Sequence, residues 1–356
     1  MTTQARWDWP VRRARAVSTT AAAAGALIVI LVISVGLGPQ GVHIGTHEEL
    51  AAIQSHVPVL RTLVHGHVSP EADTITWQMR LPRALTAVLI GALLAYAGVA
   101  FQGLLMNPLA DPYTVGVSAG AAVGAAIAEV AGIGTWFMGL GSTALAFVAA
   151  LVAVSIVYAI ARVGRRVPVQ SFLLAGVVVG TFLWALIPLL LVVTGRADQT
   201  SRLLFYLIGS IQYADWTRAA LLAPFLLAGG VCLHLWAREL NLVTLGEESA
   251  AHLGVEIERF KVRVLLVGSL ATAAAVSVGG IIGFVGLVVP HLARRLVGPD
   301  HRTLLPLAAL FGSILLLASD TIVRVYLNEL PVGVVTSLVG APVFCAILRK
   351  RHAPAW

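Results

Sequence analysis

The sequence predicts an all-α protein that crosses a membrane about ten times. Of its 356 residues, 58% are hydrophobic and 12% are charged, and the mean hydropathy is +0.89. A soluble domain carries about 25% charged residues. Apolar stretches close to the roughly 20 residues that span a bilayer recur from end to end. We therefore expect one polytopic membrane domain.

Ten apolar stretches are expected to form the membrane helices. They cover residues 18–38, 84–105, 114–132, 140–161, 170–194, 218–237, 264–281, 283–293, 303–323 and 333–348. The eighth, 283–293, is short for a full crossing. It is expected to be half-embedded or packed against protein, because backbone exposed to lipid must be hydrogen-bonded internally. The transmembrane domain is then 18–348, between tails at 1–17 and 349–356.

The distribution of basic residues predicts the orientation. With ten spans, 17 of the 24 Lys and Arg residues fall on the side of the N-terminus and 7 on the other side. Basic residues accumulate in cytoplasmic segments, so both termini are expected in the cytoplasm. The net charge of +7 is explained by this topology, and no patch for nucleic acid is indicated.

Residues 39–83 are expected to form the first outer loop. Apolar residues recur in it at spacings of three and four, which predicts an amphipathic helix in the outer interface. These residues are Leu50, Ile53, Val57, Leu60 and Val64. Five histidines also fall there, at His43, His47, His56, His65 and His67. Their spacing fits no familiar metal-ligand pattern, so we expect a solvated loop and no metal site.

Three glycines in the third predicted helix repeat every four residues, at Gly116, Gly120 and Gly124. Small residues at this spacing let two helix backbones approach closely. We expect them to pack against another helix of the same chain.

The sequence predicts neither ATP hydrolysis nor ion coupling by this chain. A Walker-type phosphate loop needs a glycine-rich turn followed by Lys and Ser or Thr, and neither Lys261 nor Lys350 stands in such a setting. Ion-coupled carriers keep ionisable groups deep in the membrane. Here the acidic residues lie in loops or near helix ends, with Glu129 and Asp320 closest to lipid. No catalytic residue is predicted. A carrier driven by an ion gradient remains the alternative to a protein that depends on a separate ATPase.

Seven segments, in order along the chain, carry a family resemblance. They are 80–83 (RLPR), 107–112 (NPLADP), 116–121 (GVSAGA), 245–255 (LGEESAAHLGV), 283–294 (GFVGLVVPHLAR), 329–336 (ELPVGVVT) and 340–342 (GAP). Together they resemble the FecCD permease family, the transmembrane subunits of siderophore, haem and cobalamin importers.

The resemblance implies partners and a location. It implies a homodimer of ten-helix subunits in the cytoplasmic (inner) membrane of a bacterium, two copies of a separate ATPase below it, and a substrate-binding protein above it. ATP and Mg²⁺ would then be bound by the ATPase, with no cofactor on this chain. An iron–siderophore complex is the expected substrate, and haem or cobalamin are the alternatives.

The inner loop 239–263 is expected to couple the permease to the ATPase. Its apolar and charged residues predict a short amphipathic helix, which on its own could be an ordinary solvated helix. The resemblance assigns the contact to Gly246, Glu247, Glu248, His252, Leu253 and Gly254, supported by Arg294 and Arg295.

On the outer side, Arg80, Arg83 and Arg324 match arginines that the family uses to dock the binding protein. Arginine suits this role because its planar fork pairs bidentately with a carboxylate. The alternative is that they mark helix ends near lipid headgroups.

The resemblance places the substrate path between the two subunits, along the fifth and tenth predicted helices. The polar or amphipathic candidates on the fifth helix are Thr181, Trp184, Thr194 and Arg196. Arg196 would meet an anionic chelate or simply cap the helix, and the sequence leaves both possibilities open.

Overall fold

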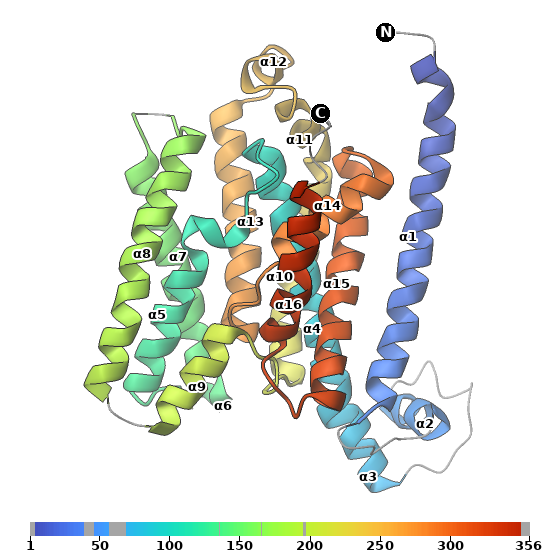
Figure 1. The fold of residues 1–356 in the computed structure, drawn as a ribbon, viewed down its shortest axis with the longest axis vertical. Coiled ribbons are helices and arrows are strands. Elements are labelled where there is room, and N and C mark those ends of the chain that lie inside the picture. The colour runs from blue at the N-terminus through green and yellow to red at the C-terminus, as the bar shows by residue number, and fades with distance from the viewer. Residues whose placement is uncertain are drawn as a thin grey trace.

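The computed structural model describes residues 4–38, 46–56, 69–134, 136–164, 166–194 and 197–349, and within these ranges it is built from helices without a β-sheet. Most helices run along one common direction (Figure 1). We call the end that carries α11 and α12 the α12 face, and the end that carries α2 and α3 the α2 face.

The helices follow one another in the order predicted. Their bounds are α1 Gln4–Gly36, α2 Thr46–His56, α3 Pro70–Asp73, η3 Thr74–Arg80, α4 Leu81–Leu104, η4 Pro112–Val115, α5 Val117–Val130, α6 Trp136–Gly139, α7 Gly141–Ala161, α8 Val169–Thr194, α9 Ala197–Ile208, α10 Trp216–Leu235, α11 Ala237–Val243, α12 Glu247–His252, α13 Ile257–Gly279, α14 Val285–Val297, α15 His301–Tyr326 and α16 Val332–Arg349. Each of the ten predicted stretches contains one helix, which confirms the all-α membrane fold.

Among the described residues, seven helical stretches are long and apolar enough to cross a membrane, and they contain α1, α4, α7, α8, α10, α13 and α15. The apolar helices α5 and α16 are shorter. The count of ten spans and the cytoplasmic position of both termini therefore stay predictions.

Helix α4 forms the centre of the bundle, where it packs against α10, α13, α14 and α15. Small residues allow this close packing. A Cβ atom at Gly91 would overlap the backbone of Gly312 in α15, and one at Gly98 would overlap the backbone of Gly286 in α14. In the 18-residue apolar stretch of the helix that contains α4, 78% of the residues are buried in the protein, compared with 22% in the corresponding stretch of α8. Helix α8 therefore offers most of its surface to lipid or to a partner.

The helix that contains α4 begins earlier than the sequence predicts. The side chain of Ser69 caps Pro70–Asp73 by accepting a hydrogen bond from the backbone N–H of Ala72, and the helix continues through the π-helical turn η3 into α4. Pro82 lies in the first turn of α4, and the wider turn before it, in which Leu81 N–H reaches Thr76 O, accommodates the proline. The predicted outer loop 39–83 is therefore already helical from Pro70.

Two short helices, α9 and α14, begin or end inside the bundle (Figure 1). Helix α14 lies against α4 and α15, as expected for the short eighth stretch, whereas α9 was not predicted. Ser210 N–H donates to Gly279 O at 2.9 Å, and Ile281 N–H donates to Tyr206 O at 3.1 Å. These bonds satisfy non-helical backbone within the membrane domain.

The three repeated glycines lie at the junction of α5 and α7. A Cβ atom at Gly120 would lie 2.6 Å from Ala153 Cβ, and one at Gly124 would overlap Leu145 O. Gly116 has a different role, because it precedes α5 with φ +85°, which favours glycine. The close contact is therefore made within the chain by Gly120 and Gly124.

Candidate functional site

Helix α12 projects beyond the bundle at the α12 face (Figure 1). Gly246 begins it at φ +109° and Gly254 follows it at φ +91°, conformations that only glycine adopts readily. Ala250 is fully buried and holds the helix to the protein, whereas Leu245 and Leu253 are 68% and 62% exposed. Two exposed leucines beside charged residues form a surface suited to a protein partner.

The two adjacent glutamates of α12 face different ways. Glu248 is exposed, together with His252 and Gly254, but the Glu247 carboxylate accepts a hydrogen bond from Lys261 Nζ at 2.7 Å. Glu247 was expected to contact the ATPase. The structure instead pairs it with a buried lysine of its own chain.

Helix α11 is anchored to the start of α15 by a polar cluster that the sequence did not reveal. Asn241 Nδ2 donates to Asp300 Oδ1 at 2.7 Å, and Asn241 Oδ1 accepts from the backbone N–H of His301 at 2.9 Å. Arg294 and Arg295 lie in the last turn of α14, Arg295 being exposed and Arg294 half-buried. Positive charge there complements the helix dipole.

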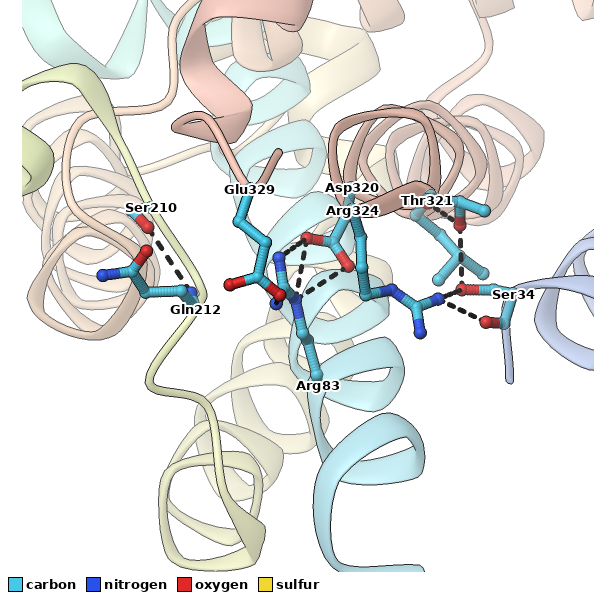
Figure 2. A network of polar contacts seen from close by, with 9 residues as sticks. Ser34, Arg83, Ser210, Gln212, Asp320, Thr321, Arg324 and Glu329 are labelled. Carbon is cyan, nitrogen blue, oxygen red and sulfur yellow. Dashed lines mark hydrogen bonds and ion pairs between the residues drawn. The ribbon is translucent and has the colours of Figure 1, made fainter. Parts of the chain in front are cut away.

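The three arginines predicted to dock a partner are buried, each no more than 8% exposed. Arg83 Nη2 donates to Asp320 Oδ1 at 2.9 Å, and its Nε donates to both carboxylate oxygens at 3.1 and 3.2 Å (Figure 2). Its Nη1 lies 3.4 Å from Glu329 Oε1. Arg83 thus joins α4 to α15 and to the segment after α15.

The other two arginines hold the end of α1. Arg324 Nη2 donates to the backbone oxygen and the hydroxyl of Ser34, and Arg80 Nη1 donates to Val35 O and Gly36 O at 2.9 Å each. The three guanidinium groups therefore bind within the chain, and their role in docking a binding protein stays a prediction. The sequence signal that was missed is Asp320, an acidic residue one helical turn before Arg324 in an apolar stretch.

Helix α2 is attached to the bundle beside Arg80. Glu49 is 2% exposed, and burial raises the pKa of its carboxyl group to about 7, although Arg80 opposes this rise. His56 stacks on Trp77 with ring centroids 4.4 Å apart and lies 3.0 Å from Asp73. Of the other loop histidines, His43, His65 and His67 lie outside the described residues.

The remaining candidates are the metal site and the two acidic residues predicted to lie closest to lipid. No group of three or more His, Cys, Asp or Glu that could hold a metal ion occurs among the described residues. Glu129 accepts a hydrogen bond from Ser142 at 2.9 Å and pairs with Arg202 at 3.3 Å. Both acidic residues predicted to lie closest to lipid, Glu129 and Asp320, therefore have basic partners.

The model of the FecCD transport family matches residues 20–350. The chain belongs to the FecCD transport family.

Individual relatives of known name match nearly the whole chain. The cobalamin import system permease protein BtuC of Halobacterium salinarum is 39% identical, over 96% of this chain and 98% of its own. The hemin transport system permease protein HmuU of Yersinia pestis is 38% identical, over 82% of this chain and 88% of its own. The solved structure of an inward-facing metal-chelate type ABC transporter superposes with a TM-score of 0.79 at 29% identity, covering 93% of this chain and 98% of that chain.

This FecCD chain is therefore a multi-pass permease subunit of an ABC importer, in the cytoplasmic membrane, and not itself an ATPase.

The residues predicted to line the substrate path lie on or near α8. Thr181 is exposed, but its hydroxyl donates to Val177 O of the same helix at 2.8 Å, and Trp184 is 42% exposed. Thr194 ends α8 with its side chain outside the described part, and Arg196 lies outside the described residues.

Proposed function

We propose that two copies of this chain form the membrane channel of an importer, with two copies of a separate ATPase at the α12 face and a substrate-binding protein at the α2 face. The observation that carries the proposal is α12 itself. It projects from the protein with Leu245, Glu248 and Leu253 exposed, while buried Ala250 fixes it in place. A short rigid helix of this kind can enter a cleft of a partner and be moved by it.

The exposed surface of α8 supports a second copy as partner. Val177, Val178 and Phe182 are 57%, 60% and 64% exposed. In α16, Leu338 is 69% exposed. Lipid could cover these side chains equally well, so dimerisation is tested by cross-linking of single cysteines in native membranes.

At the α2 face, Arg83 is the arginine best placed to meet a binding protein. Its bond to Asp320 is buried, but its contact with Glu329 is longer, and the Glu329 side chain is 48% exposed. Asn328 and Glu329 both have positive φ, at 47° and 60°, which is an uncommon conformation for residues other than glycine. An acidic residue of the binding protein would replace Glu329 on the guanidinium group.

Measurement of ATP hydrolysis tests whether a separate subunit is the ATPase. The purified chain alone should show no ATPase activity, because no Walker-type loop occurs in its sequence. Activity should appear with the cognate ATPase and increase when the loaded binding protein is added. Robust ATP turnover by this polypeptide alone would contradict the proposal.

For the substrate, we propose an iron–siderophore complex, the first expectation from the sequence. Cobalamin is the second candidate, because the relative that matches 96% of this chain is a cobalamin permease, and haem is the third. Uptake of ⁵⁵Fe-ferrichrome, ⁵⁷Co-cyanocobalamin and haemin into proteoliposomes containing the full complex separates the three. The ligand that co-purifies with the binding protein provides an independent answer.

A further inference from the structure

Lys261 lies in the second turn of α13, 4% exposed, and contacts three segments of the chain. Its Nζ lies 2.7 Å from Glu247 Oε2 of α12, 3.4 Å from Glu258 Oε1 of α13, and 3.4 Å from Val167 O, just before α8. A lysine ammonium group has three N–H donors and no acceptor. The three acceptors therefore match its full hydrogen-bonding capacity.

Val167 is held from both sides of its backbone. Its N–H donates to Glu258 Oε2 at 2.9 Å, while its C=O accepts from Lys261. The segment before it is a tight turn, in which Val163 and Arg166 exchange two backbone hydrogen bonds of 2.9 and 3.1 Å. Helix α8 begins two residues later, at Val169. A displacement of Val167 therefore displaces the first turn of α8.

The start of α8 is not enclosed by protein on every side. A cavity of about 680 Å³ lies beside it, lined by Met106 and Asn107 after α4, Gln170 and Leu173 of α8, and Glu247 of α12. Only 22% of the residues in the apolar 18-residue stretch of α8 are buried in the protein. Polar contacts to Lys261 and Glu258 attach this end of α8 to α13, in addition to the packing of α8 against α5, α7 and η4.

We propose that Lys261 is a positioning residue that joins α12 to the first turn of α8, so that a displacement of α12 moves α8. This inference rests on the proposed function, in which an ATPase displaces α12. The physical reason is the buried ammonium group: moving Glu247 away takes from Lys261, whose side chain is 6% exposed, its closest acceptor at 2.7 Å, and breaking a buried ion pair is costly. The lowest-energy response to a push on α12 is that α12, Lys261 and the turn before α8 move together.

A structural role alone would also explain a buried lysine, and the experiment must separate the two. The assembled complex of permease and ATPase carries spin labels at pairs of exposed positions, in a background without Cys232 and Cys345. One pair is Ser249→Cys with Arg302→Cys, which reports α12 against α15. The other is Gln170→Cys with Arg302→Cys, which reports α8 against α15. Labelled chains are diluted with unlabelled ones so that distances within one subunit are measured.

Two variants break the connection in different ways. Lys261→Met removes the ammonium group, and Glu258→Gln replaces with an NH2 group one of the two oxygens that accept from Val167 N–H and from Lys261. The matched control is Arg259→Met, which also removes a cation from the start of α13, but from an ion pair with Glu256 in which the side chains are 72% and 65% exposed.

Wild type and Arg259→Met should show changes in both distances when ATP binds. In Lys261→Met and Glu258→Gln the α12 distance should still change and the α8 distance should not. Substrate transported per ATP hydrolysed should fall roughly tenfold in both variants, a typical effect of a residue on a coupling path. If Lys261→Met does not assemble, Glu258→Gln decides alone.

Movement of α8 in the two variants equal to that in wild type would overturn the role of Lys261. A complex in which neither distance changes in wild type would contradict the proposed function itself, and the inference with it. A parallel fall of transport and hydrolysis, at an unchanged ratio, would also overturn the inference, because it would indicate a structural defect only.

Discussion

Two buried charged clusters lie at opposite ends of the molecule, and they differ in what they hold. At the α2 face, Arg83 and Asp320 join α4 to α15, the two helices with the most extensive mutual packing. At the α12 face, Lys261 joins α12 to the start of α8. The apolar stretch of α8 is 22% buried, compared with 78% for the stretch that contains α4. The first ion pair therefore joins two helices at the centre of the bundle, and the second joins two elements that we propose to move together.

The largest expected effect is on stability at the α2 face. Asp320→Asn leaves the Arg83 guanidinium buried without its close partner. Removal of one member of a buried pair costs about 3–5 kcal/mol. Denaturant unfolding of the detergent-solubilised chain measures this loss. A variant as stable as wild type would show that the pair does not hold α4 to α15.

The next effect is on partner binding at the α12 face. Glu248→Arg reverses an exposed charge on α12 and should weaken ATPase association by roughly 10- to 100-fold, since mismatched charge at an interface costs several kcal/mol. The free energy of unfolding should not change. Glu256→Arg, 65% exposed in its side chain but outside α12, is the control. Equal ATPase affinity for both variants in a titration would move the contact away from α12.

A smaller effect is expected from Glu329→Gln, which removes the second carboxylate near Arg83. Its side chain is 48% exposed and the contact is 3.4 Å, so the cost in unfolding free energy should be below about 1 kcal/mol. Binding-protein association, measured by surface plasmon resonance, should become faster because Arg83 Nη1 is released. Slower association would indicate that Glu329 itself contacts the binding protein.

The smallest effect concerns pH at α2. The pKa of Glu49 is raised to about 7 in the folded protein, from 4.5. The folded state therefore binds a proton that the detached helix releases, and the attachment of α2 should weaken as pH rises from 4.5 through 7. Hydrogen exchange of α2 amides should be slower at pH 5 than at pH 7.5, after correction for intrinsic rates. In Glu49→Gln this difference should disappear, and its persistence would assign the effect to another group.

Hydropathy predicted the long helices because they are apolar both where they are buried in the protein, as α4 is, and where they are exposed on its surface, as α8 is. It did not predict α9, since a helix of 12 residues that is apolar on one side has no long apolar stretch. The partners of the arginines were not predicted, for a different reason. The partner of Arg83 lies 237 residues away in the sequence, so only the packing of α4 on α15 brings the pair together.

The orientation of the two glutamates of α12 also could not be predicted from the sequence. Glu247 and Glu248 are adjacent residues of the same type, and the family resemblance assigned both to the predicted contact with the ATPase. Which one faces inward depends on Lys261, which arrives from α13 at a position set by the fold. The structure pairs Glu247 with Lys261 and leaves Glu248 exposed, and a contact of Glu248 with the ATPase stays a prediction.

Uptake into proteoliposomes that contain the permease, its ATPase and the loaded binding protein tests the central claim most directly. Because Glu129 and Asp320 are both paired with arginines, we expect uptake that persists with an ionophore present and stops when ATP or the ATPase is omitted. Uptake that continues without ATP and collapses with the ion gradient would contradict the account and establish a secondary carrier.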